Sequence, residues 1–318
     1  MASKHFYNIP DDAVWFITGS SSGIGLALAQ LIASHPKQRL IATARNASRL
    51  NEHLPQSERV HTIDLDVTSE DAIDTAIKIA LSKFGRIDVM VNNAGYGLMG
   101  DTESALQPDG QAKARKVVET DFWGTARLCL HAIQVFRDEN PKTGQQGGVV
   151  LNVTSLGGFA GFPGTAFYHA AKFGVEGFTE GISKEVRPEW NIHFSLIEPG
   201  GTSTNFASSS SMDWLVPHPA YAAADSPTRL LEGYVRDPNM QKTWTPAARV
   251  ALAMYKVVVR ARDTSIPVRL PLTEGAWQVI KAEVAAVDKE LDEVKELSLS
   301  VEVDDANQAG QFLTDNYS

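Results

Sequence analysis

One short stretch of this chain holds a serine, a tyrosine and a lysine whose types and spacing suit acid–base chemistry. Ser155 follows an apolar run, and Tyr168 and Lys172 form a Y-x-x-x-K pair further along. On a helix, residues four apart share a face, so the Lys172 ammonium would stand beside the Tyr168 phenol. A neighbouring ammonium favours the phenolate, and we predict that it lowers the pKa of Tyr168 from about 10 toward working pH. Tyr168 would then serve as a general acid or base, with Ser155 hydrogen-bonded to the oxygen whose proton moves.

A glycine-rich turn near the start of the chain is typical of a phosphate-binding site. Gly19, Gly23 and Gly25 lie between an apolar run (residues 13–18) and a helical pattern, which indicates a strand, a turn and a helix. Glycines let the backbone approach a pyrophosphate, whose charge is favoured at a helix N-terminus. The same letters spell G-x-S-x-G around Ser21, so a serine hydrolase with Ser21 as nucleophile stays a remote alternative. The sequence has no cysteine and histidine cluster, and we expect no metal site.

Short apolar runs alternate with helical patterns along most of the chain. This alternation predicts an α/β fold with a doubly wound parallel sheet, the Rossmann fold. In such sheets ligands bind beyond the carboxyl ends of the strands, and each of these motifs follows a predicted strand, so we expect one shared site. The predicted strands are residues 13–18, 39–44, 60–65, 87–91, 147–154, 191–197 and 265–270, and the predicted helices include residues 69–84, 111–137, 166–185 and 246–260.

Composition limits the class of protein and its surroundings. The 318 residues are 43% hydrophobic, with a formal net charge of −9, which argues against general nucleic-acid binding. The single cysteine, Cys129, allows no disulfide within the chain and fits a reducing compartment. The first residues lack the apolar segment of a signal peptide, and no apolar run reaches the roughly 18 residues of a membrane span. We therefore expect a cytoplasmic protein that does not bind membranes.

The second half of the chain changes in character after residue 204. A serine run (residues 208–211) and several prolines indicate a partly helical, mobile substrate lid over about residues 205–246. We assign residues 1–270 to the main domain and residues 271–318 to a C-terminal extension. In that extension, residues 274–297 form an amphipathic helix with a solvated charged face, and a loose tail follows. The side chains expected to line an apolar substrate pocket are Phe159, Phe162, Met212, Trp214 and Tyr221.

Four motifs in the expected order make the chain resemble the short-chain dehydrogenases/reductases. They are T-G-x-x-x-G-x-G (residues 18–25), N-N-A-G (residues 92–95), the serine, tyrosine and lysine set, and P-G-x-x-x-T (residues 199–204). The long C-terminal part resembles the fungal and steroid-dehydrogenase-like NADP-dependent members. The resemblance implies that Tyr168 is the general acid/base, that Lys172 lowers its pKa and holds the nicotinamide ribose, and that Ser155 polarises the substrate oxygen. It also implies a homo-oligomer.

The resemblance further implies which residues contact the cofactor. The glycine turn would line the pyrophosphate, the third strand would end at the adenine, and the fourth at the adenosine ribose. The segment after residue 198 would flank the nicotinamide. The residues implied in this order are Gly19, Ser21, Ser22, Gly23 and Ile24; Asp66 and Val67; Asn93, Ala94 and Gly95; and Pro199, Gly200, Thr202 and Thr204.

One position departs from the family pattern. The family usually has an asparagine in a T-N-F-x-G motif, and here residues 119–125 read E-T-D-F-W-G-T, which places Asp121 there. In the family this residue helps to hold a water that links the lysine to solvent. If the backbone carbonyl holds that water, an aspartate can replace the asparagine; if the side-chain amide does, the relay is altered and Lys172 gains a nearby anion. We expect activity in either case and count Asp121 among the catalytic candidates.

The end of the second predicted strand indicates which cofactor is used. An acidic residue there would bind the ribose 2′-hydroxyl of NAD, but Arg45 follows the strand instead. Its planar guanidinium suits a 2′-phosphate, so we predict NADP(H). The expected reaction is hydride transfer between the nicotinamide and a ketone or secondary alcohol. A redox-neutral isomerase or dehydratase and an NADP-sensing regulator on the same fold stay open as alternatives.

Overall fold

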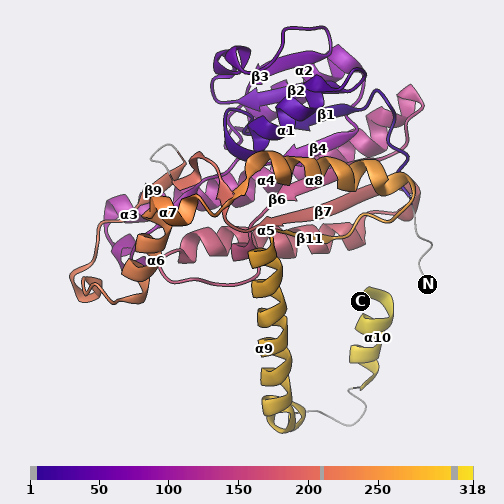
Figure 1. Cartoon of the computed structure of the whole chain (residues 1–318). Helices are drawn as coiled ribbons and strands as arrows, with labels where there is room; N and C mark the ends of the chain where they lie inside the picture. The colour runs from indigo at the N-terminus through magenta and orange to yellow at the C-terminus, as the bar shows by residue number, and fades with distance from the viewer. Residues whose placement is uncertain (1–5, 208–210, 302–306, 318) are drawn as a thin grey trace.

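A seven-stranded parallel sheet forms the centre of the computed structural model, which describes residues 6–207, 211–301 and 307–317 (Figure 1). The strand order is β11-β7-β6-β4-β1-β2-β3, so the chain builds outward from β1 in one direction and then in the other. This order confirms the predicted doubly wound α/β fold. The strands are β1 Val14–Ile17, β2 Arg39–Ala44, β3 Val60–Asp64, β4 Val89–Asn92, β6 Gly148–Val153, β7 Ile192–Pro199 and β11 Arg269–Leu272.

The central strands are apolar on both faces because helices cover both sides of the sheet. In β1 the side chains alternate: Trp15 and Ile17 pack on one face, and Val14 and Phe16 pack on the other. All four are fully buried. Continuous apolar runs of this kind are what a parallel sheet between two helical layers requires.

Two helical layers enclose the sheet (Figure 1). Helices α1 and α8 pack against each other on the face that holds Trp15, and α2, α4 and α5 contribute to the core of the opposite face. Ser69 caps α2 by accepting a hydrogen bond from the Ala72 amide, and Gly85 ends it in the left-handed conformation, so the predicted limits of this helix were right. The helices are α1 Gly23–Ser34, α2 Glu70–Phe84, α3 Pro108–Val118, α4 Gly124–Gln134, α5 Ala166–Glu185 and α8 Ala247–Val259.

The long helix predicted for residues 111–137 contains two irregular turns. Between α3 and α4 the chain forms a π-helical turn, Glu119–Trp123, and a second one, Val135–Glu139, follows α4. A π turn inserts one extra residue into the helix and often occurs at functional sites. The first of these turns carries Asp121, whose side chain is fully buried.

The segment after β7 folds over the carboxyl edge of the sheet and is held at both ends. Strand β9 pairs in parallel with β5, and the short β10 pairs with β8. Asp101 anchors the middle: its fully buried carboxylate accepts hydrogen bonds from the His218 amide (2.9 Å) and the Arg229 guanidinium (3.0 Å). Residues 208–210 of the serine run lie outside the described residues. The elements are β5 Gly97–Met99, β8 Thr202–Ser203, β9 Met212–Trp214, α6 Pro227–Arg236, α7 Pro238–Gln241 and β10 Thr245–Pro246.

The C-terminal part consists of two helices. Helix α9 (Glu274–Leu299) leaves the body directly after β11, and α10 (Asn307–Tyr317) follows residues 302–306 (Figure 1). The expectation of a loose tail was therefore wrong for residues 307–317, which are helical. Within the described parts of the chain, no helix is both long and apolar enough to cross a membrane.

We predict that Asp101→Ala loosens the segment from β9 to α6. The change removes the buried carboxylate that joins the Arg229 guanidinium to the His218 amide, and leaves Arg229 with Glu232 of its own helix as its ion-pair partner. A lost hydrogen bond to a charged group costs about 1.5–3 kcal/mol, so amide exchange in residues 212–236 should accelerate roughly 10- to 100-fold. Hydrogen exchange read by mass spectrometry measures this. Glu103→Ala is the matched control, because Glu103 contacts the same segment only near the surface, at the Tyr221 hydroxyl (3.0 Å) and at His218 Nε2 (3.9 Å); equal acceleration in both variants would contradict the anchoring role.

Candidate active site

The turn between β1 and α1 can be built only with glycines. Gly19 and Gly23 have φ angles of 66° and 58°, in the left-handed region that favours glycine. At Gly25 a Cβ atom would lie 2.4 Å from both the Gly19 carbonyl oxygen and the Asn93 amide nitrogen. The Ser22 side chain makes no capping hydrogen bond to α1, which leaves the first amides of that helix for a ligand.

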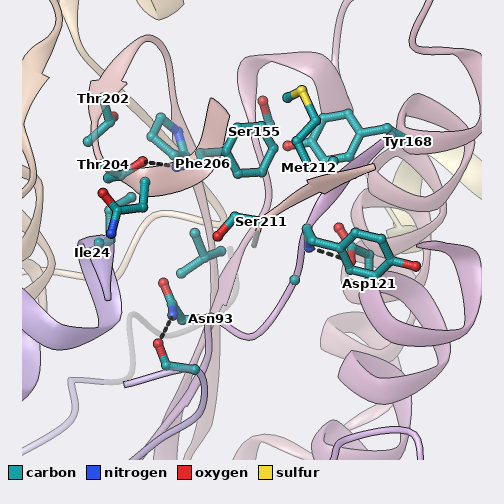
Figure 2. Close-up of a pocket in the computed structure, with 18 of the residues that line it drawn as sticks. Ile24, Asn93, Asp121, Ser155, Tyr168, Thr202, Thr204, Phe206, Ser211 and Met212 are labelled. Atoms are coloured by element: carbon teal, nitrogen blue, oxygen red, sulfur yellow. Dashed lines mark hydrogen bonds between the residues drawn. The ribbon is translucent and has the colours of Figure 1, made fainter. Parts of the chain in front are cut away.

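Asn93, which follows β4, holds this turn in place through side-chain hydrogen bonds. Its side-chain amide donates to the carbonyl oxygens of Thr18 (3.0 Å) and Gly19 (3.2 Å) (Figure 2). In return, the Thr18 hydroxyl accepts from the backbone amides of Asn93 and Ala94, each at 3.0 Å. The N-N-A-G motif therefore braces the glycine turn, a structural task beyond the ribose contact that the sequence resemblance implied.

One cavity of about 1340 Å³ lies at the carboxyl edge of the sheet, and every catalytic and cofactor-binding residue predicted from the sequence lines it. The glycine turn and the ends of β2, β3, β4, β6 and β7 all contribute to its wall, as the placement of the motifs predicted. The predicted residues in its lining are Gly19, Ser21, Ser22, Gly23, Ile24, Arg45, Asp66, Val67, Asn93, Ala94, Gly95, Asp121, Ser155, Tyr168, Lys172, Pro199, Gly200, Thr202 and Thr204.

Ser155, Tyr168 and Lys172 converge at the centre of the cavity. Ser155 follows β6 and its oxygen accepts a hydrogen bond from the Gly157 amide (3.0 Å), which fixes its rotamer. The Ser155 hydroxyl and the Tyr168 phenol both line the cavity, and their side chains lie near each other in Figure 2. One helical turn after Tyr168, the Lys172 ammonium donates to the Val153 carbonyl (3.2 Å) and lies 5.7 Å from the centre of the tyrosine ring.

Asp121 forms an ion pair with Lys172. One of its carboxylate oxygens lies 3.1 Å from the Lys172 Nζ, and the other accepts a hydrogen bond from the Tyr96 amide at 3.0 Å. Gly95 makes room for it, since a Cβ there would lie 3.1 Å from both carboxylate oxygens. Of the two possibilities that the sequence left open, the geometry matches the one in which Lys172 gains an anionic neighbour.

This ion pair and the burial of the site reverse the expected direction of the Tyr168 pKa. Burial raises the pKa of Tyr168 above its ordinary value, Lys172 and the Ser155 hydrogen bond lower it by less, and Asp121 raises it further. The prediction of a lowered pKa is therefore wrong for the protein without ligands. Burial also lowers the pKa of Lys172, but Asp121 and Tyr168 more than compensate, so the lysine stays protonated. The pKa of Asp121 is raised by its full burial, against the opposing effect of Lys172.

His169, next to the tyrosine, fixes the loop that follows Ser155. Its Nδ1 donates to the Gly157 carbonyl (2.6 Å), which requires the neutral Nδ1–H tautomer because a carbonyl oxygen can only accept. Its Nε2 then accepts from the Phe162 amide (2.9 Å) and lies 2.6 Å from the Thr165 hydroxyl. Burial lowers the pKa of His169, which keeps this tautomer neutral. Sequence reasoning missed this residue, although it sits inside the Y-x-x-x-K motif.

A second buried charge cluster lies one turn beyond Lys172 on α5. Glu176 accepts a hydrogen bond from the Thr154 hydroxyl (2.6 Å) and pairs with Arg269 of β11, which also contacts Glu198 (3.3 Å). Burial raises the pKa of Glu176, with a further increase from Glu198. Glu176 also helps to raise the pKa of Lys172. The cluster ties α5, β7 and β11 together behind the catalytic candidates.

Two arginines line the far end of the cavity, beyond β2. Arg45 is joined there by Arg49, which lies in the 3-10 helix Ala47–Glu52, with Glu52 and His53 beside them. Sequence reasoning missed Arg49, and no local pattern in the sequence marks it as a lining residue. Asp66 lines the same region, and one of its oxygens accepts from the amide (3.0 Å) and hydroxyl (2.7 Å) of Thr68.

The predicted apolar pocket was partly wrong. Phe162 and Met212 line the cavity, but Phe159 and Trp214 pack beneath the guanidinium groups of Arg269 and Arg236, and Tyr221 is exposed beside Glu103. Phe206 takes the place nearest the tyrosine, with its ring 5.8 Å from the Tyr168 ring. Other apolar lining residues that the sequence did not indicate are Leu98, Met99, Leu231, Tyr234, Val235, Trp244 and Val279.

The alternative of a serine hydrolase finds no support at Ser21. Its side chain is exposed on the glycine turn, and no hydrogen bond joins it to a histidine among residues 6–207, 211–301 and 307–317. The same residues contain no cluster of histidine, cysteine, aspartate and glutamate side chains that could hold a metal ion.

Comparison with known proteins gives concordant matches over most of the chain. The family model described as short chain dehydrogenase matches residues 13–214. Oxidoreductase calM from Penicillium decumbens is 42% identical over 295 residues, which are 92% of this chain and 94% of that protein. An uncharacterized oxidoreductase, C162.03, from Schizosaccharomyces pombe is 32% identical over 92% of this chain and 93% of its own length. The crystal structure of a short-chain dehydrogenase from Streptomyces avermitilis matches with a TM-score of 0.76 at 29% identity, over 91% of this chain and 100% of that chain.

We predict that Asp121→Asn lowers the pKa of Tyr168. Asp121 raises that pKa, so replacing the carboxylate with a neutral amide should shift the phenol titration to lower pH. Ultraviolet difference titration of phenolate, with Tyr168→Phe as the baseline, measures the shift without any substrate. Glu119→Gln makes the same charge change in the same π turn, but at a half-exposed residue that pairs with Arg127, and serves as the control. An unchanged titration in Asp121→Asn would show that the ion pair does not govern Tyr168.

Proposed function

The chain belongs to the short-chain dehydrogenase family, and from this premise we propose that it is an NADP(H)-dependent reductase of bulky apolar ketones, working through Ser155, Tyr168 and Lys172. The observation that carries the proposal is the convergence of these three side chains, at the ends of β6 and on α5, inside the cavity that begins at the glycine turn. A general acid, its cationic neighbour and a hydroxyl donor then stand at the point where a carbonyl oxygen would acquire charge.

The shape of the cavity fits a dinucleotide. The glycine turn brings backbone, without side chains, to the cavity wall, since a Cβ at Gly19 would lie 2.9 Å from the Ala94 Cα. The start of α1 gives the pyrophosphate a favourable helix terminus. Pro199, Gly200, Thr202 and Thr204 line the opposite part, where the nicotinamide would lie beside Tyr168. When bound, the nicotinamide supplies or accepts the hydride.

In the direction of reduction, Ser155, Tyr168 and Lys172 stabilise and protonate the carbonyl oxygen of the substrate. Ser155 donates a hydrogen bond to the substrate carbonyl, and Tyr168 gives its phenolic proton to that oxygen as the carbonyl carbon gains the hydride. The resulting phenolate is stabilised by the Lys172 ammonium, which Asp121 keeps protonated and in place. Reprotonation of the phenolate from solvent completes the cycle, and oxidation of a secondary alcohol follows the same steps in reverse.

The preference for NADP(H) follows from the charges at the far end of the cavity. Arg45 and Arg49 both line it, and the position directly after β2, where an acid would bind a ribose diol, is Arg45 itself. Arginine recognises phosphate through its planar fork of donors. Two arginines in the lining at this end of the cavity thus favour a ribose that carries a 2′-phosphate.

The character of the substrate follows from the wall opposite the glycine turn. The Phe206 ring lies 5.8 Å from the Tyr168 ring, and Phe162 and Met212 line the same cavity. Leu231, Tyr234, Val235 and Trp244 extend this apolar surface along the segment from α6 to β10. A wall of this size suits a bulky apolar ketone rather than a small or charged one.

The first prediction from this function concerns Tyr168. Tyr168→Phe removes the transferred proton, so the rate of ketone reduction should fall about a thousandfold while NADPH binding changes little. Initial rates of NADPH oxidation with a panel of aromatic, steroid-like and polycyclic ketones measure this. Tyr96→Phe removes another cavity-lining phenol whose oxygen is buried, and should cost far less. Full activity in Tyr168→Phe would refute the mechanism, and NADPH binding without turnover of any ketone would favour a redox-neutral enzyme or a sensor.

The second prediction concerns the cofactor. Arg45→Ala and Arg49→Ala should each weaken NADPH binding about 10-fold or more and leave NADH binding nearly unchanged, because a charged hydrogen bond to phosphate contributes about 1.5–3 kcal/mol. Fluorescence titration gives both dissociation constants. Lys37→Ala removes the same charge from an exposed site that pairs with Asp11 and is the control. Equal affinities for NADH and NADPH, unaltered in both arginine variants, would contradict the assignment.

A further inference from the structure

Helix α9 projects away from the body of the protein for most of its length (Figure 1). Among its 26 residues only Ala276 is buried, and its main neighbours, β11 and the turn at Leu156–Gly158, lie at its N-terminal end. Beyond that end, large apolar side chains face solvent: Val284 is 53% exposed, and Leu291 is 62% exposed. Most helices are stabilised by packing of an apolar face, so an unpacked apolar face of this length indicates a surface that binds another molecule.

Six apolar residues of α9 form one stripe with the spacing of a coiled coil, and the exposed Leu297 and Leu299 lie outside it. Successive members are three and four residues apart in strict alternation, which is the 3.5-residue period of a left-handed coiled coil. This stripe, which we call the α9 seam, consists of Trp277, Ile280, Val284, Val287, Leu291 and Val294. All six are of types that fill the core positions of paired helices.

Helix α10 and an anionic membrane surface are both poor candidates to cover the α9 seam. Helix α10 has 11 residues and would be about 16 Å long, whereas the seam from Trp277 to Val294 spans about 26 Å. An anionic membrane surface would be repelled, because α9 carries seven acidic residues and three lysines. The partner must therefore offer a long apolar helix of its own.

One edge of the seam is complementary to a second copy of itself, whereas the other edge carries Glu283 and Glu290, which would stand opposite each other's copies and weaken the pairing. Lys281, Asp288 and Lys295 recur every seven residues beside the seam, with alternating charge. When two such helices run antiparallel, this edge faces the same edge of the partner, and Lys281 of each copy can stand opposite Asp288 of the other. In that register Val284 packs on Val287, Ile280 on Leu291, and Trp277 on Val294, so all six seam residues are used. The antiparallel arrangement also sets the two bodies at opposite ends of the pair.

We propose that α9 is a self-association helix, and that two copies of the chain pair through the α9 seam as an antiparallel coiled coil. The base of α9 lies at the active-site cavity, where Ala276 and Val279 form part of the wall. Pairing therefore shelters Trp277 directly beside the site. The inference does not depend on the proposed reaction, since it rests only on the surface of α9.

Disulfide trapping tests the pairing and its direction. The native Cys129 is buried, and burial raises its pKa to about 12, so an added cysteine on α9 is the reactive thiol. Full-length Val284→Cys and Val287→Cys chains, mixed and mildly oxidised, should give a disulfide-linked dimer at least 10-fold faster than either chain alone. Mixed Ala282→Cys and Ala285→Cys chains, with cysteines on the exposed opposite face, are the control. Pairing through any other surface leaves this result unaffected.

A solution measurement completes the test. Sedimentation velocity of the wild-type chain should show an association that Val287→Asp with Leu291→Asp weakens at least 10-fold, while Ala282→Asp with Ala285→Asp does not. Both seam residues face solvent in the single chain, so the variant should keep its fold, which circular dichroism checks. Equal cross-linking by single mutants and the mixture would overturn the antiparallel pairing. An absence of cross-links, or an association unchanged by the seam variant, would overturn the α9 seam as a self-association surface.

Discussion

The buried ion pair between Lys172 and Asp121 is the constraint on which the site depends. A lysine ammonium inside a protein must be matched by an anion or by full hydrogen bonding, because burial of an unpaired charge costs several kcal/mol. Here the match comes from Asp121 and from the Val153 carbonyl at the end of β6. These contacts require the π turn, the glycine at position 95 and the start of α5 to meet at one point. The π turn and the glycine at position 95 are therefore explained by the same requirement as the catalytic geometry, which is that the buried Lys172 ammonium must have an anionic partner.

Much of the fold and the site could be predicted because parallel α/β sheets place their strand ends together. Motifs far apart in the sequence, from Gly19 to Thr204, were expected to share an edge on this ground alone, and the cavity collects them. The limits of α2 were also predictable, since Ser69 and Gly85 carry local capping signals. Arg49 was not predictable in this way, because it lies in a short 3-10 helix beyond the strand end and only the tertiary fold brings it to the cavity.

Other features depend on tertiary structure that no local pattern encodes. The direction of the Tyr168 pKa is set by burial, which outweighs Lys172 and cannot be read from a four-residue spacing. The π turn at Asp121 could not be predicted, because the spacing of apolar residues in this part of the sequence does not indicate an inserted residue. Phe159, Trp214 and Tyr221 were placed in the pocket on residue type alone, and two of them are covered by arginines instead. Helix α10 lacks an apolar periodicity strong enough to separate it from a polar tail.

The pairing of β9 with β5 has a consequence for the order of folding. Gly97 and Met212 are neighbours in this small sheet but far apart in the sequence, and strands β6 and β7 of the central sheet lie between them along the chain. Closing so long a loop costs entropy that earlier contacts must first offset. The central sheet should thus form before β9 docks, and the outer wall of the cavity should be the last part to assemble. Nascent chains would then acquire the Rossmann core while their catalytic residues are still open to water.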